Sequence, residues 1–228
     1  MDIDHPDIIE FINMRVPTGD VNRKNLNLHH SINIPDEFMR AVERNEMWDL
    51  VDPNDETPRE TIRARELWET LLEIRFRTGE PCIHFITESN RHLPQPLKDL
   101  GLRVNSSNLC QEITLPTTPI QHVDDEQGEI ALCILSAVNV GGLNDLNELE
   151  NICDLSVRAL EQIIDYQDYP VKAAEVSTKK RRSLGIGYIG LAHYLAKNGV
   201  KYSDPKAWEL VDRLSEAFQY NLLRASCN

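Results

Sequence analysis

The spacing of hydrophobic residues divides the chain into helix-like and strand-like segments. In several stretches the apolar residues recur three or four positions apart, which is the period of an amphipathic helix. Gly79 and Gly199 follow two of these stretches and are natural helix stops. The predicted helices cover residues 5–15, 35–50, 59–79, 141–166 and 203–228, and the second half of 183–199.

Shorter apolar stretches favour β-strands. Residues 26–35 end at a proline, and residues 81–87 directly follow a predicted helix. Residues 130–140 are almost continuously apolar, which is typical of a strand buried on both faces. The segments 88–104 and 117–129 are polar and rich in turn-forming residues, so we expect irregular structure there. A helix followed by a strand indicates an α/β fold.

Composition and charge narrow the class of protein. The chain has 228 residues, 41% of them hydrophobic, and its 24 basic residues face 37 acidic ones, giving a formal net charge of −13. This balance argues against binding to nucleic acid or to an anionic membrane, because both need clustered Lys and Arg. The N-terminal stretch is acidic and amphipathic, unlike a secretory signal, and no apolar run of about 18 residues occurs. We therefore expect a cytoplasmic protein.

The cysteines follow neither a disulfide pattern nor a zinc pattern. There are five, an odd number, and no CxxC occurs. Cys82 and Cys153 lie in apolar patterns, where cysteine usually packs as a small hydrophobic residue. His29 and His30 lack metal-ligand spacing, and His84 is expected to be a hydrogen-bonded core residue of its strand. We therefore predict no metal site and a reducing compartment.

Two further motifs receive structural interpretations. "GIGYIG" (185–190) matches G-x-G-x-x-G, but the polar stretch "STKKRRS" precedes it where a dinucleotide site needs a strand. We expect these glycines to allow close packing of a strand against a helix instead. "KKRR" (179–182) is the only basic cluster, and we expect a solvated turn, with contact to a phosphate as the alternative.

The stretch "NSSNLCQEITLP" (105–116) is the strongest candidate for chemistry. If it were extended, Asn108, Cys110 and Glu112 would project to one side, because side chains alternate along a strand. A carboxylate beside a thiol works against the thiolate, so this environment suits a thiol that keeps its hydrogen better than a nucleophile. Cys133 lies in the next predicted strand and could reach a pocket beside the loop. Inert packing of both cysteines remains the alternative at this point.

"SSNLCQEITLPT" and "GEIALCILSAVNVG" together resemble the large, catalytic subunit of aerobic class I ribonucleotide reductase. The resemblance extends through "RARELWETLLEIRFRTGEPCIHFITESN", "VRALEQIIDYQDYP" and "RRSLGIGYIGLAHYLAKNG" to essentially the whole chain. It implies an α/β fold that is part of a ten-stranded α/β barrel with a central finger loop. Residues 1–228 would then be a single partial catalytic barrel domain: 1–104 the end of the first half-barrel, 105–116 the finger loop and 129–228 the start of the second half-barrel.

The resemblance also implies an activity, the reduction of ribonucleoside diphosphates to deoxyribonucleoside diphosphates for DNA synthesis by thiyl-radical chemistry. Cys110 would be the transient thiyl radical that takes the 3′-hydrogen of the ribose. Glu112 would be the general base on the 3′-hydroxyl, and Asn108 would hold the substrate hydroxyl. Ser107 would be a further substrate contact, beside Asn108 and Glu112. Cys133 would be one of two thiols that supply electrons and end as a disulfide.

The partners follow from the same resemblance. No cofactor or metal would be bound directly, since a metal-containing small subunit would supply the radical and thioredoxin or glutaredoxin the electrons. The family's second reducing cysteine, its radical-transferring tyrosines and its redox CxxC have no match, and the last predicted helix runs to the end of the chain without a stop. We therefore expect a middle segment, inactive alone, that assembles with complementary large-subunit segments.

Two alternatives are kept. One is a non-catalytic remnant that serves only as an assembly fragment of the same barrel. The other is a thiol-redox protein that uses Cys110 and Cys133 as a pair without a radical. The missing CxxC and the acidic neighbour Glu112 count against the second alternative.

Overall fold

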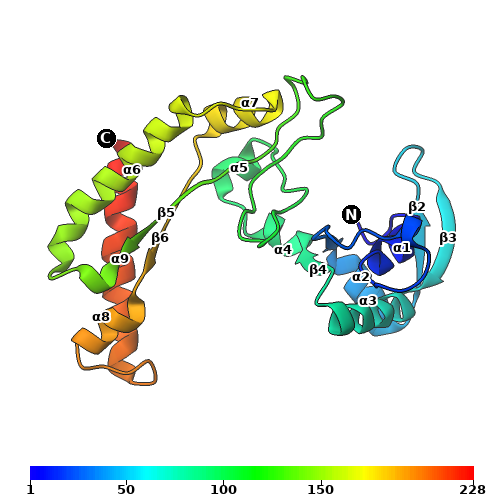
Figure 1. The fold of residues 1–228 in the computed structure, drawn as a ribbon, viewed down its shortest axis with the longest axis horizontal. Coiled ribbons are helices and arrows are strands. Elements are labelled where there is room, and N and C mark those ends of the chain that lie inside the picture. Colours follow the sequence, from blue (N-terminus) through cyan, green and yellow to red (C-terminus); the bar gives the residue numbers. More distant parts are fainter. The chain divides into compact units, whose positions relative to one another are not determined.

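The computed structural model describes residues 1–228, which form two compact units, Met1–Thr117 and Thr118–Asn228 (Figure 1). Each unit has its own hydrophobic core. The first unit contains α1 (Ile8–Asn13), η1 (Val21–Arg23), β1 (Ser31–Ile34), α2 (Asp36–Arg44), β2 (Met47–Val51), β3 (Pro58–Arg63), α3 (Ala64–Thr78), β4 (Cys82–Phe85), α4 (Ile86–Arg91) and α5 (Gln95–Asp99). The second contains β5 (Ile134–Asn139), η2 (Val140–Gly142), η3 (Leu146–Glu148), α6 (Leu149–Tyr166), α7 (Lys172–Arg181), β6 (Leu184–Ile189), α8 (Leu191–Lys197) and α9 (Pro205–Cys227).

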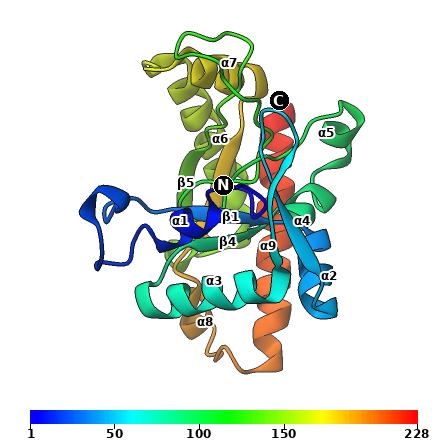
Figure 2. The same ribbon diagram turned by 90° about the vertical axis from the view of Figure 1, so that its right-hand side faces the viewer.

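The first unit is built around the parallel pair β1·β4. The pairing runs from Ser31 opposite Cys82 to Ile34 opposite Phe85, and Figure 2 shows the two strands side by side. The core between this pair and the helices is completely apolar at its centre, where burying such side chains contributes about 25 cal/mol per Å². Its fully buried side chains include Ile3, Ile8, Ile12, Ile32, Ile34, Phe38, Leu50 and Leu71.

The hairpin β2·β3 lies where parts of two helices were predicted. The helix expected over 35–50 ends at Arg44, because Asn45 adopts a left-handed conformation with φ of 56°. The helix expected over 59–79 begins only at Ala64. The stretches removed from these helices pair with each other, with Trp48 opposite Ile62. Strand β2 contains Trp48 and Val51 and β3 contains Thr61 and Ile62, all of residue types that favour strands over helices.

The second unit is built around a second parallel pair, β5·β6. The pairing runs from Ile134 opposite Leu184 to Asn139 opposite Ile189. Helices α6 and α9 pack against each other, and Figure 1 shows them running alongside the two strands. The core joins strand and helix residues, namely Val138, Val140, Leu143, Leu149, Cys153, Leu214 and Phe218.

Most other predicted elements are confirmed with shifted ends. The strands expected over 26–35, 81–87 and 130–140 appear as β1, β4 and β5. The helix expected over 141–166 begins at Leu149, after two short 3-10 turns. The structure also adds helices that the sequence did not predict: α4 and α5 lie in the segment expected to be irregular, and α7 lies before "GIGYIG".

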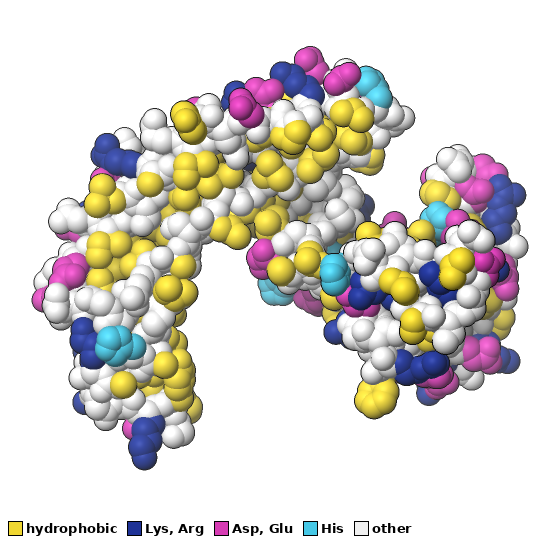
Figure 3. All heavy atoms as spheres, viewed as in Figure 1, with side chains coloured by type: hydrophobic (Ala, Val, Ile, Leu, Met, Phe, Trp, Pro, Cys, Tyr) yellow, Lys and Arg dark blue, Asp and Glu magenta, His cyan; other side chains and the backbone are white.

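The predicted α/β class is confirmed, but the strands do not close a barrel. They form three separate two-stranded sheets. In the second unit, Leu135 and Ile189 remain 57% and 58% exposed, and Figure 3 shows apolar side chains gathered where β5 and β6 lie. None of the helices is both long and apolar enough to cross a membrane.

Candidate functional site

The loop 105–116 is closed at its neck. The side-chain amide of Asn105 donates a hydrogen bond of 2.8 Å to the carbonyl of Thr117, and the N–H of Thr117 donates one of 3.2 Å to the carbonyl of Arg103. Val104 and Pro116, which flank the projecting part, are buried. The two arms of the loop therefore meet at one point, so its tip projects from a fixed base within the first unit.

The tip of the loop is a tight turn. The N–H of Gln111 donates a hydrogen bond of 3.1 Å to the carbonyl of Asn108, and Gln111 has a positive φ of 63°. The condition that the stretch is extended is therefore not met, and strand alternation does not place Asn108, Cys110 and Glu112 on one side. Instead, Cys110 lies exposed at the turn and Glu112 is exposed just after it. Asn side chains favour such turns because they bond to nearby backbone.

Asn108 and Ser107 hold the two arms of the loop together. The side-chain oxygen of Asn108 accepts a hydrogen bond of 3.0 Å from the N–H of Ile113. The hydroxyl of Ser107 lies 2.9 Å from the carbonyl of Ile113 and 3.4 Å from the same Asn108 oxygen. The two residues predicted to contact substrate therefore also shape the turn that presents Cys110.

A cavity lies beside the loop within the first unit. Its volume is about 280 Å³, and its walls include Ser107, Asn108, His30, Asn33 and Phe11. A hydrogen bond of 2.9 Å from the side-chain amide of Gln111 to the Ser31 hydroxyl fixes the loop tip to the start of β1. The loop and the β1·β4 pair thus form one continuous surface.

A buried polar network supports the neck of the loop. The amide nitrogen of Asn33 donates to Asp2 at 2.7 Å and to the carbonyl of Asn105 at 2.9 Å. The Asn33 oxygen is thereby left as the acceptor for Nδ1 of His84, 2.9 Å away, and Nε2 of His84 accepts from the Ser89 hydroxyl at 2.7 Å. Burial lowers the pKa of His84, which keeps its ring neutral. The prediction that His84 is a hydrogen-bonded core residue is confirmed.

The role of Asn33 was missed from the sequence. Asn33 is the polar residue in the otherwise apolar run "INI", and it is only 8% exposed. A polar residue at an inward-facing strand position needs hydrogen-bond partners, because an unpaired buried amide is costly. That interruption of the apolar run was the available signal.

A second cluster of charged and titratable groups surrounds Glu80. Its carboxylate is paired with Nδ1 of His29, and its other oxygen lies 3.4 Å from Nδ1 of His30 and 3.6 Å from Nε of Arg15. Burial lowers the pKa of His30, and the neighbouring Glu80 only partly offsets this. No group of three or more His, Cys, Asp and Glu side chains could hold a metal ion.

Cys133 lies one residue before β5, in a segment that is firmly anchored. Glu129 forms an antiparallel bridge with Thr118, and its buried carboxylate pairs with Lys180 at 2.8 Å and with Arg181. Burial acts to raise the pKa of Glu129, but the hydrogen bonds from Lys180 and Arg181 hold it below its usual value. The N–H of Ile134 continues the anchoring, with a 3.4 Å hydrogen bond to the carbonyl of the residue before β6.

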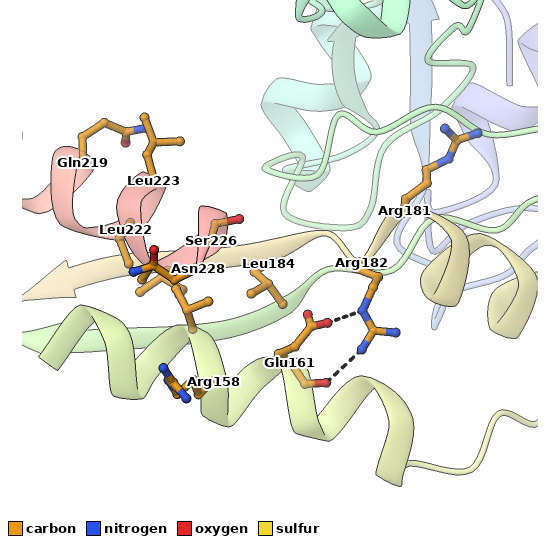
Figure 4. Close-up of a pocket in the computed structure, with 13 residues that line it drawn as sticks. Arg158, Glu161, Arg181, Arg182, Leu184, Gln219, Leu222, Leu223, Ser226 and Asn228 are labelled. Carbon is orange, nitrogen blue, oxygen red and sulfur yellow. Dashed lines mark hydrogen bonds and ion pairs between the residues drawn. The ribbon is translucent and has the colours of Figure 1, made fainter. Parts of the chain in front are cut away.

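The basic cluster is therefore not a solvated turn. It forms the last turn of α7 and the residue after it, and each of its cations has a carboxylate partner in the second unit. Figure 4 shows Arg182 turned toward Glu161 of α6, whereas Arg181 extends in another direction. These two arginines also border a cavity of about 720 Å³ between α6 and the end of α9. Because the cations are already paired, the cluster does not favour a phosphate site.

The "GIGYIG" stretch does not form a dinucleotide-binding turn. Gly185 and Gly187 lie inside β6, whereas the fingerprint needs its glycines after a strand. Gly190 has a φ of 79° at the start of α8, and a Cβ there would meet Asn139 and lie 3.1 Å from the N–H nitrogen of Gly141. Close packing at the strand-to-helix junction is confirmed for Gly190. Gly185 instead faces the neighbouring strand.

Comparison with known proteins gives a consistent result. The family model described as "Ribonucleotide reductase, barrel domain" matches residues 1–228. The chain is 43% identical over 233 aligned residues to a protein of Frog virus 3, and the match covers 99% of this chain. That protein is named as a ribonucleoside-diphosphate reductase large subunit, an assignment that is itself a prediction. It is 51% identical over 168 residues to the ribonucleoside-diphosphate reductase subunit alpha of Haemophilus influenzae, covering 74% of this chain. The chain spans 40% of the length of the first relative, and the second match spans 22% of that protein.

Proposed function

Because the chain belongs to the ribonucleotide reductase barrel-domain family, we propose that it is a segment of a catalytic subunit that reduces ribonucleoside diphosphates to deoxyribonucleoside diphosphates. The observation that most supports this proposal is the loop 105–116, which presents the thiol of Cys110 at an exposed turn on a fixed neck. A cavity lined by Asn108 and Ser107 lies beside this loop, where substrate hydroxyls could be held.

The proposed reaction begins and ends at Cys110. Its thiyl radical takes the 3′-hydrogen of the ribose, while Glu112 accepts the proton of the 3′-hydroxyl and Asn108 holds a substrate hydroxyl. The 2′-hydroxyl then leaves as water, and Cys133 with a second cysteine supplies two electrons and two protons as their thiols become a disulfide. The 3′-hydrogen finally returns from the Cys110 thiol to the substrate radical, which regenerates the Cys110 thiyl radical, and Glu112 returns its proton to the 3′-oxygen. The substrate has exchanged one hydroxyl for one hydrogen, and the cysteine pair has been oxidised.

The partners in this proposal follow from what the reaction consumes. A separate small subunit with a metal centre supplies the radical, and thioredoxin or glutaredoxin reduces the disulfide. Complementary segments of the large subunit supply the second reducing cysteine and the rest of the barrel. A cytoplasmic location suits thiols that must return to the reduced state after each turnover. The chain contributes parts of both half-barrels, with residues 105–116 as the finger loop.

The proposal is tested in an enzyme assembled from this chain, its flanking segments and a small subunit. We expect Cys110→Ser to abolish deoxyribonucleotide formation, because a hydroxyl does not form the radical that a thiol forms. The matched control is Cys227→Ser, since Cys227 is exposed at the end of α9 and has no role in the reaction. The 228-residue chain alone should give no turnover.

Three results would contradict the proposal. Normal product formation by Cys110→Ser would remove Cys110 from the mechanism. Failure of every combination of flanking segments to give activity would favour the alternative of a non-catalytic assembly fragment. A reversible disulfide between Cys110 and Cys133, formed without a small subunit, would instead favour a simple thiol-redox protein.

A further inference from the structure

Gly185 of β6 lies against the thiol of Cys133. A Cβ placed on Gly185 would lie 2.7 Å from Sγ of Cys133 and 2.5 Å from Cδ2 of Leu135. Neither distance is compatible with ordinary van der Waals contact. The space that an alanine methyl would fill is thus already occupied by the thiol and by the leucine beside it.

The backbone of Gly185 does not itself require glycine. The residue lies within β6, opposite Leu135, and does not have the positive φ found at Gly79, Gly101 and Gly190. Glycine inside a strand costs conformational entropy and packs no side chain, so it usually marks a close approach of another group. Here the approaching groups are the side chains of Cys133 and Leu135.

We propose that Gly185 is a positioning residue that leaves the thiol of Cys133 the room it needs to form its disulfide. This inference rests on the proposed role of Cys133 as a reducing thiol. Two glycines of "GIGYIG" then have distinct roles. Gly185 leaves room for the Cys133 thiol, and Gly190 forms the tight junction between β6 and α8.

An added methyl on Gly185 would meet two side chains, and displacing the Cys133 thiol has the larger consequence. Leu135 is 57% exposed and has two rotatable side-chain bonds, so it can turn into solvent. Cys133 has a single rotatable bond with three staggered positions, and a methyl on β6 would exclude those that point toward that strand. Its backbone cannot move away easily, because Glu129 and Ile134 hold the segment on both sides.

Disulfide formation makes the position of this sulfur critical. The two thiols lose two protons and two electrons, which replace the substrate hydroxyl by hydrogen and release water. The new S–S bond requires a narrow range of dihedral angles and Cβ separations. A thiol confined to another rotamer would meet these requirements less often, so the reducing step would slow even if substrate still bound.

Gly187 provides a matched control. It lies two residues along the same strand and therefore on the same side of β6 as Gly185. A Cβ on Gly187 would meet nothing within 4 Å. Gly187→Ala thus makes the same chemical change in the same strand without touching the thiol.

The first test compares Gly185→Ala with Gly187→Ala in the assembled reductase. We expect Gly185→Ala to lower kcat by about 100-fold, the loss typical of a group displaced by about 1 Å, with KM unchanged. After a single turnover without external reductant, alkylation and mass spectrometry should find Cys133 oxidised in the wild type and in Gly187→Ala but still reduced in Gly185→Ala. Adding Leu135→Ala to Gly185→Ala should not restore kcat.

The second test separates the thiol from a general loss of stability. In the 228-residue chain, Cys133→Ala removes the sulfur that an alanine at position 185 would meet. The destabilisation caused by Gly185→Ala should therefore be smaller in the Cys133→Ala background, and this double-mutant cycle does not depend on activity. A shift in unfolding midpoint that is the same in both backgrounds would overturn the inference.

The remaining outcomes distinguish this inference from the function on which it rests. Wild-type kcat and full Cys133 oxidation in Gly185→Ala would overturn the role of Gly185 alone. Recovery of kcat by Leu135→Ala would also overturn it, since Leu135 would then be the affected group. Absence of Cys133 oxidation in the wild type after substrate turnover would instead contradict the proposed function.

Discussion

The β1·β4 and β5·β6 pairs have the same local architecture, two parallel strands joined by helical connections, but they support their cysteines in different ways. The first pair supports the Cys110 loop through one buried amide: Asn33 bonds to the backbone at the loop neck, to a neutral His84 and to Asp2. The second supports Cys133 through charge, with Glu129 held between Lys180 and Arg181.

This difference matters because the two thiols have different tasks in the proposed reaction. Cys110 projects into solvent on a turn, so its position depends on how well the loop neck is fixed. Cys133 lies beside a strand, so its position depends on the anchoring of one short segment and on the space at Gly185. Loss of either support should affect one unit and leave the other folded.

The largest effect is expected from Glu129→Gln. The Glu129 side chain is 7% exposed and that of Arg181 12%, so the change leaves a largely buried cation without its partner. Removing one member of a buried ion pair costs about 3 kcal/mol or more. Denaturant unfolding should show the lower stability of the variant. Hydrogen exchange should locate that loss of stability in the second unit, with exchange accelerated around Cys133.

A surface ion pair in the same unit provides the control. Arg158 and Asp154 lie four residues apart on α6 with side chains 71% and 35% exposed. Asp154→Asn should cost only about 0.3–0.5 kcal/mol. If both variants lost similar stability, the charged anchor beside Cys133 would be no more important than any surface pair, and the comparison between the two units would fail.

The second largest effect is expected from Asn33→Ala. This variant leaves the N–H of His84 and the carbonyl of Asn105 without their partner, which costs about 1–3 kcal/mol for a buried group. Hydrogen exchange should accelerate in residues 103–117 and remain unchanged in the second unit. Asn54→Ala, in the exposed turn of the β2·β3 hairpin, should leave the loop unaffected. Equal exchange in the two variants would mean that Asn33 does not hold the neck.

The elements that could be predicted from the sequence are those whose hydrophobic residues follow one clear pattern, typical of either a helix or a strand. The helices α3, α6 and α9 and the strands β4 and β5 follow from apolar spacing. The β2·β3 hairpin could not be found this way, because its two strands directly adjoin α2 and α3 and extend the apparent pattern of those helices. Helix α7 was missed because its apolar side is made of small residues, Ala173 and Ala174, rather than large ones.

The candidate site was predictable in its residues but not in its geometry. The order Asn108, Cys110, Glu112 is visible in the sequence, and Ser107 and Cys133 follow from the resemblance. The turn at Gln111 depends on side-chain to backbone hydrogen bonds within the loop, which no periodicity reports. The supports of the two thiols also escaped prediction, because Asn33 and Glu129 find their partners far along the chain.

A smaller effect is expected from acid. Burial lowers the pKa of His84 and of His30, whereas in the unfolded chain each histidine titrates near its ordinary value of about 6.5. The unfolded state therefore binds more protons as the pH falls below about 6.5, so the first unit has its full stability above that pH and loses it progressively below. Unfolding measured from about pH 8 to pH 5 should show this slope.

His84→Gln tests how much of that slope belongs to the network under the loop. Glutamine can still donate to Asn33 but cannot titrate, so the slope should become shallower while the loop neck stays protected from exchange. His30, with Glu80 3.4 Å away, should account for the slope that remains. An unchanged slope in His84→Gln would mean that His84 does not couple folding of this unit to pH.

The smallest effect is expected from Gln111→Asn at the tip of the Cys110 loop. Asparagine tolerates the positive φ of this position better than most residues, so the turn should persist. Its side chain is one carbon shorter and should not reach Ser31, so the variant loses one partly exposed hydrogen bond, a cost of about 0.5–1 kcal/mol. Exchange should then rise at residues 109–112 and stay unchanged at the neck. Faster exchange at the neck as well would mean that the tip and the neck open together. The support of Cys110 would then be one cooperative structure, not a neck held by Asn33 and a tip held separately by Gln111.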